Sequence, residues 1–100
     1  MGHTGAEPSA AEPTWTFLSN HGHVLVAIKE SPDARVRDLA ARVGISERAV
    51  QLIVGDLERA GYVVKERSGR RNHYTVNGGR HLRHPAERQS SLDDLLSIFS

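Results

Sequence analysis

The sequence contains no cysteine and few aromatic residues, with one Trp, two Tyr and two Phe among 100 residues. Without cysteine the chain can form no disulfide, thiolate zinc site or thiol nucleophile. It also lacks an apolar run approaching the roughly 20 residues that cross a membrane. Its first residues have neither the basic start nor the apolar stretch of a signal peptide. We therefore expect a cytoplasmic protein without a membrane partner.

Net charge is also small, at +1, yet the charges are unevenly distributed. Residues 21–80 carry eleven Lys or Arg against seven Asp or Glu, whereas both flanking segments are net acidic. The densest cationic stretch is KERSGRR, residues 65–71, with four Lys or Arg and one Glu. Most short basic clusters are solvated surface, but a focused one is also the electrostatic footprint of nucleic-acid binding.

The length and composition, with 38% hydrophobic and 25% charged residues, fit one small globular domain. Residues 1–13 are rich in Ala, Gly, Pro and Glu and predict a disordered leader. The apolar spacing that follows predicts helices, the first N-capped by Ser19 or Asn20 and the last by Ser46. The expected helices are residues 20–30, 37–43 and about 46–60.

The periodicity changes after Gly61. YVVKER and NHYTVN, residues 62–67 and 72–77, are rich in β-favouring residues and are joined by a glycine-containing segment, which predicts a hairpin with a basic tip. A helical pattern returns near the C-terminus, with Ser90 or Ser91 as its N-cap. Its apolar stripe consists of Leu92, Leu95, Leu96 and Phe99.

The segment VRDLAARVGISERAVQLIVG, residues 36–55, has the pattern of a helix-turn-helix. The small Ala40 stands where two helices must approach closely, and Gly44 suits the turn between them. Such a motif needs these residue types because the second helix must cross the first steeply with its outer face free. Because a basic hairpin follows directly, a chance match to the helix-turn-helix pattern is a poorer explanation.

With that hairpin included, the chain resembles the winged-helix transcription regulators of the MarR and ArsR type over about residues 20–77. The residues that carry the resemblance are RDLAARVGISERAVQLIVGDLERAGYV and RSGRRNHYTV. It implies a mostly α fold with a small β-hairpin: a winged helix-turn-helix with an additional C-terminal helix. It also implies a short strand at 34–36, which the residues alone leave open as an extended connector. The domains expected are the leader 1–13, the DNA-binding domain 14–81 and a dimerisation helix within 82–100.

The resemblance implies sequence-specific binding of double-stranded DNA, with residues 46–60 as the recognition helix. The outward residues of that helix suit base edges: Arg48 guanine, Gln51 adenine and Glu47 a cytosine amino group. Leu52 suits a thymine methyl, and Ser46 at the helix N-terminus suits a phosphate. The alternative is that these are ordinary solvated side chains.

The expected wing, residues 62–77, carries the second group of DNA contacts. Arg70 and Arg71 at its tip would reach the adjacent minor groove or the backbone. Lys65, Arg67 and His73 would add phosphate contacts.

Gly55 stands inside the recognition helix, where glycine costs about 1 kcal/mol relative to alanine. The apolar positions continue to Leu57 and Ala60, so the helix passes through Gly55 and ends at Gly61. Gly55 lies one turn beyond Gln51 on the outward strip. A missing side chain there would allow close approach to DNA or to a neighbouring backbone, unless the position is merely tolerated.

The apolar stripe of the C-terminal helix can either fold back onto its own subunit or pair with a second copy. We predict a homodimer, because so small a domain has few other surfaces for this stripe and because dimers match palindromic DNA sites. The residues expected at the interface are Trp15, Phe17, Leu18, Leu92, Leu95, Leu96 and Phe99.

Six histidines raise the question of a metal. On a helix His21 and His23 would project in different directions, and although His81 and His84 could share a face, we expect surface histidines and no metal. No nucleophile stands beside a base in a recognisable pattern, so we expect neither an enzyme nor a cofactor. No residue pattern specifies an effector ligand.

The main alternative function is a winged helix that binds protein without DNA sequence specificity, because fold does not fix function. The concentration of positive charge on the wing and the polar outer face of the recognition helix favour DNA instead.

Overall fold

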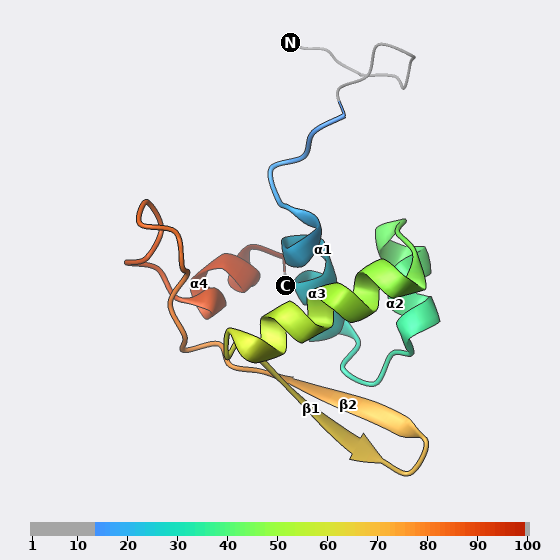
Figure 1. Cartoon of the computed structure of the whole chain (residues 1–100). Helices are drawn as coiled ribbons and strands as arrows, with labels where there is room; N and C mark the ends of the chain where they lie inside the picture. The colour runs from blue at the N-terminus through green and yellow to red at the C-terminus, as the bar shows by residue number, and fades with distance from the viewer. Residues whose placement is uncertain (1–13, 100) are drawn as a thin grey trace.

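The computed structural model describes residues 14–99, so the leader predicted at 1–13 lies outside the described part of the chain. Helices precede a two-stranded hairpin, and a short helix follows it (Figure 1). The bounds are α1 Asn20–Glu30, α2 Val36–Val43, α3 Glu47–Arg59, β1 Val63–Ser68, β2 Arg71–Val76 and α4 Leu92–Leu96, followed by a 3-10 turn at Ser97–Phe99. This confirms the expected winged helix with a C-terminal helix.

Helix α1 begins where the sequence offers an N-cap. The Ser19 hydroxyl accepts a hydrogen bond from the Gly22 amide at 3.4 Å, which satisfies one of the free amides of the first turn. The helix ends at Glu30, before Pro32 disfavours helical geometry at Ser31. Its buried face consists of Val24, Leu25, Ala27 and Ile28.

The turn between α2 and α3 is made by Gly44 and Ser46, as expected. Gly44 has a φ of 86°, the left-handed conformation that glycine adopts without a steric penalty. The Ser46 hydroxyl then caps α3 by accepting a hydrogen bond from the Ala49 amide at 3.0 Å, a contact that stabilises a helix by about 1 kcal/mol. Helix α3 runs through Gly55, and its buried face consists of Val50, Ile53, Val54 and Leu57.

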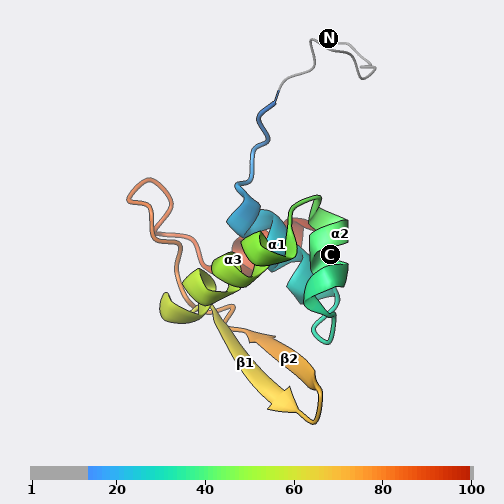
Figure 2. The same ribbon diagram turned by 45° about the vertical axis from the view of Figure 1, so that its right-hand side comes forward.

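The hairpin projects away from the helices (Figures 1 and 2). Its antiparallel pairs run from Val63 with Val76 to Ser68 with Arg71, which leaves Gly69 and Arg70 as a two-residue loop. Gly69 has a φ of 64°, and glycine at the first loop position is typical of a type II′ turn. Buried residues of the hairpin lie near its base, where Val63 and Tyr74 join the core.

The short strand implied at 34–36 is wrong, because the sheet in the described part of the chain consists of β1 and β2 alone. The Ala34 amide donates to the Ser31 carbonyl inside a turn, and the Arg35 carbonyl accepts from the amides of the first turn of α2. These groups are therefore unavailable for strand pairing. The loop just before this segment is joined to β2, because the Tyr74 amide donates to the Pro32 carbonyl at 2.9 Å.

The C-terminal segment packs onto the same core. Ser91 caps α4 in a capping box with Asp94, and Leu92 and Leu96 are only 1% and 3% exposed. These two leucines therefore fold back onto the core of their own subunit, which was one of the two arrangements expected for this stripe. None of the helices within residues 14–99 is long and apolar enough to span a bilayer.

Candidate nucleic-acid interface

The outward face of α3 is exposed and polar. Glu47, Arg48 and Gln51 are exposed, and Leu52 is 59% exposed. Within residues 14–99, neither Arg48 nor Gln51 forms a side-chain hydrogen bond or ion pair. Because the opposite face of the helix is buried in the core, these side chains project from a fixed backbone. They are therefore free to bind an external partner.

Ser46 lies at the N-terminal end of this face, as predicted. Its oxygen is occupied as the cap of α3, where it accepts from the Ala49 amide. A hydroxyl that accepts one hydrogen bond still has its own proton to donate. Ser46 can therefore cap the helix and donate to a phosphate at the same time.

The basic wing residues do not all lie on one side of the hairpin. Residues paired across antiparallel strands share a face, so Lys65 and Arg67, which pair with Tyr74 and Asn72, lie on one face. By the same register Arg71 lies on the other. Arg70 and Arg71 are exposed and, among the described residues, form no ion pair. The tip of the hairpin therefore presents two arginines that form no ion pair within the described residues.

His73, predicted to contact phosphate, has a partner inside the molecule. Its Nδ1 lies 2.7 Å from an oxygen of Asp33, in the loop between α1 and α2. The neighbouring Tyr74 amide donates to the Pro32 carbonyl. These two adjacent contacts hold β2 against the loop, so His73 positions the wing. No sequence pattern indicates this pair, whose members lie 40 residues apart.

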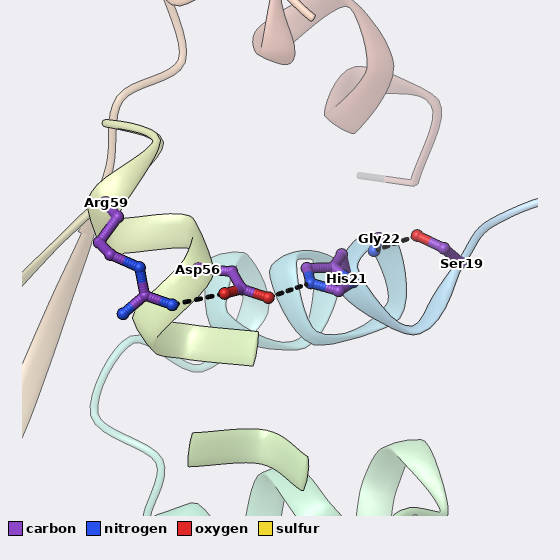
Figure 3. Close-up of polar contacts among 5 residues, drawn as sticks. All are labelled: Ser19, His21, Gly22, Asp56 and Arg59. Carbon is purple, nitrogen blue, oxygen red and sulfur yellow. Dashed lines mark hydrogen bonds and ion pairs between the residues drawn. The ribbon is translucent and has the colours of Figure 1, made fainter. Parts of the chain in front are cut away.

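A second polar cluster joins α3 to α1 (Figure 3). Asp56 lies between His21, with 2.8 Å from Oδ2 to the His21 Nε2, and Arg59, with 2.5 Å from Oδ1 to the Arg59 guanidinium. The hydrogen bonds from His21 and then Arg59 hold the pKa of Asp56 below its ordinary value. This cluster fixes one side of the recognition helix to the helix beneath it.

Arg59 also explains the space at Gly55. A Cβ placed on Gly55 would lie 3.2 Å from the Arg59 Nη1, and its nearest neighbours are all guanidinium atoms of that arginine. The absence of a side chain at Gly55 therefore leaves room for the Arg59 guanidinium. Arg59 is not among the residues predicted from the sequence, although it stands four residues after Gly55 and shares its helical strip with Arg48.

The histidines are dispersed. In the described part of the chain, no three His, Asp or Glu side chains are grouped so that they could hold a metal ion. His81 donates from Nδ1 to the Arg88 carbonyl at 2.7 Å, and the His84 Nδ1 accepts from the Ala86 amide at 3.0 Å.

A different surface lies where α1 faces the C-terminal segment. An open groove of about 720 Å³ runs there, and its lining is mostly apolar. Phe17 and Ile98, which line it, are 95% and 71% exposed. Trp15, 66% exposed, packs edge to face against Phe17 with ring centroids 5.2 Å apart. Of the predicted interface residues, the groove is lined by Phe17, Leu18, Leu95 and Phe99.

The model of the MarR family matches residues 16–71, more than half of the chain. The match extends from the segment before α1 to the first residue of β2, and so includes α2, α3 and the tip of the hairpin. No curated protein matches the sequence.

Proposed function

This chain belongs to the MarR family of winged-helix transcriptional regulators, and from that premise we propose that it binds double-stranded DNA in a sequence-specific manner. The observation that supports the proposal most directly is the outward face of α3, which is polar, exposed and held on a capped helix. A face of this kind fits the major groove, which admits one α-helix.

We assign base contacts to the N-terminal half of α3. Arg48 can bond guanine O6 and N7, and Gln51 can bond adenine N6 and N7. Glu47 and Leu52 are assigned to a cytosine amino group and a thymine methyl. Gly55 and Arg59 continue this strip toward the C-terminal end of the helix, where we assign contacts to the backbone rather than to bases.

The wing supplies contacts that do not depend on sequence. Arg70 and Arg71 lie at the end of the hairpin and lack partners within the described residues, so each can neutralise a phosphate or enter the minor groove. Lys65 and Arg67, on one face of the hairpin, add positive charge along its length. The contact between His73 and Asp33 helps to hold the wing in position, together with Val63 and Tyr74 in the core.

We further propose that the apolar groove beside α1 is covered by a second copy of the chain. Four large exposed side chains gather in or beside it: Trp15, Phe17, Ile98 and Phe99. Exposed apolar patches of this kind mark interaction sites. A homodimer would bury them and place two α3 helices on half-sites about one helical turn apart, about 34–36 Å. Binding to chromosomal DNA would place the protein in the cytoplasm.

The decisive experiment is selection of bound duplexes from a random pool, using the full chain at about 50 mM salt. We expect a palindromic motif whose half-sites are separated by one turn. Affinity for that motif should fall steeply as salt rises, because several phosphates are neutralised. Failure to enrich any sequence, with no affinity for duplex at low salt, would overturn the proposal and favour a protein-binding winged helix.

A further inference from the structure

Three arginines surround a depression at the C-terminal end of α3. They come from different segments, Arg59 from the helix and Arg80 and Arg83 from the loop that follows β2. The depression has a volume of about 630 Å³, and Tyr62 and His81 complete its polar lining. No carboxylate lines it. Of the three, Arg59 is assigned above to the DNA backbone, whereas Arg80 and Arg83 take part in none of the contacts assigned so far.

Arg80 is held in place from two directions. Its Cζ lies 5.9 Å from the centroid of the Tyr62 ring, within the range of a cation–π contact. A Cβ placed on Gly61 would lie 3.1 Å from the same Cζ, so the guanidinium lies close over that glycine. The loop backbone is fixed as well, because Tyr62 donates to the His81 carbonyl at 2.7 Å and the Leu92 amide donates to the Arg80 carbonyl at 2.9 Å.

The cluster is also short of negative charge. Arg83 forms no hydrogen bond or ion pair within residues 14–99. Asp56, the acid that bonds Arg59, also bonds His21 and so is shared. Cations held together in this way repel one another unless an anion lies between them.

We propose that Arg59, Arg80 and Arg83 form a binding pocket for a phosphate group. Guanidinium groups present planar pairs of donors that match phosphate oxygens, and a tetrahedral anion can accept from three of them at once. The phosphate belongs either to the DNA backbone beside α3 or to a free phosphorylated small molecule. In both cases its oxygens compete with Asp56 for Arg59, so binding weakens the cluster that joins α3 to α1.

The first test needs no DNA and is therefore independent of the proposed function. Inorganic phosphate and phenyl phosphate are titrated into the full chain at constant ionic strength, and the Nε–H signals of the arginines are followed by NMR. We expect saturable shifts at Arg59, Arg80 and Arg83. The Arg83→Gln variant should bind about tenfold more weakly, since it lacks a charge-assisted hydrogen bond. Arg83 has no partner within the described residues, so this variant should fold normally.

Arg88→Gln is the matched control. Arg88 lies in the same loop and is exposed, but it does not line the depression, so this variant should bind phosphate like the unmodified chain. Shifts that never saturate, or an equal loss in Arg83→Gln and Arg88→Gln, would overturn the proposal, because either result means general attraction of anions.

A second arm identifies the source of the phosphate. If DNA supplies it, excess duplex should abolish the phosphate-induced shifts, and Arg83→Gln should lower the salt slope of DNA binding by about 1. If a free molecule supplies it, phenyl phosphate should still bind to the protein when the protein is in complex with duplex DNA, and Arg83→Gln should leave the salt slope of DNA binding unchanged. Both results support the pocket and distinguish its two ligands.

Discussion

The two exposed faces of this small protein differ in kind. The face made by α3 and the wing presents polar and cationic side chains, whereas the groove beside α1 presents aromatic and aliphatic ones. The same core supports both, because the helices bury one side each and leave the other free. Salt screens charges but does not weaken apolar burial. Contacts through the first face should therefore be sensitive to salt, and contacts through the second should tolerate it.

The largest effect is expected from Ile98→Asp, which tests the apolar face. Ile98 is 71% exposed, so the subunit should fold normally. A carboxylate at a buried interface costs several kcal/mol, so sedimentation should show a monomer for this variant and a dimer for the unmodified chain, at both low and high salt. Affinity for a two-half-site duplex should fall by about a hundredfold or more, as bivalent binding is lost.

Val64→Asp is the control for this substitution. Val64 is 54% exposed and lies on β1, away from the groove, so its variant should stay dimeric. A dimer that persists in Ile98→Asp would show that the groove is not the interface.

The double variant Arg70→Ala with Arg71→Ala tests the cationic face. It should weaken binding to all duplexes by about tenfold at low salt and lower the salt slope by about 2, because two phosphate contacts are lost. Fluorescence anisotropy over a salt series measures both quantities. The double variant Lys29→Ala with Arg88→Ala removes the same amount of charge away from the wing and should leave the salt slope unchanged. An equal change of slope in the two double variants would show that only net charge matters.

Gln51→Ala separates sequence reading from general attraction on the same face. Preference for adenine at one position of each half-site should fall by about tenfold, as expected for a lost bidentate contact. Binding to unrelated duplex should not change, and this serves as the internal control. Repeating the duplex selection with the variant measures the effect, and an unchanged motif would remove Gln51 from the base-reading residues.

Gly55→Ala should raise the free energy of unfolding by up to about 1 kcal/mol, because alanine favours helix. The added methyl group contacts the end of a flexible Arg59 side chain at 3.2 Å, which can move by a few tenths of an ångström. Thermal unfolding and DNA affinity are measured together. Higher stability with lower affinity would confirm close approach of this strip to DNA, whereas unchanged affinity would show that the glycine only accommodates Arg59.

The smallest effect concerns pH and Asp56, at the edge of the cationic face. Its pKa is lowered in the folded state by His21 and Arg59, so its contribution to stability is present above the unfolded pKa of about 3.9. That contribution is lost as pH falls through the lower folded value. Asp56→Asn should therefore show a shallower loss of stability in acid. Identical acid unfolding curves would mean that the cluster does not stabilise the fold.

Local features of the fold were predictable from the sequence because their causes lie within a few residues. The caps at Ser46 and Ser91 and the left-handed turn at Gly44 depend on neighbours three or four positions away. The cause is equally local for the strand wrongly implied at 34–36, because the Ala34 amide is already bonded within a turn.

The candidate site was less predictable. The outward residues of α3 follow from helical periodicity, and Arg59 could have been found in the same way. The pairs that fix α3 and the wing join residues 35 and 40 positions apart, so they depend on how the helices pack. Likewise, the contact between Arg80 and the Tyr62 ring depends on the fold, so the sequence does not indicate that Arg80 is held in place.

In mechanical terms the hairpin is a lever. Its lateral support is at Pro32 and Asp33, which contact β2 at Tyr74 and His73. Beyond that support about 10 Å of ribbon extends to Arg70, at about 3.3 Å per residue. A tilt of about 6° at the fulcrum displaces a tip at that distance by about 1 Å, a third of the length of a hydrogen bond. A small change of angle at the loop after α1 therefore displaces the end of the hairpin that carries the arginines.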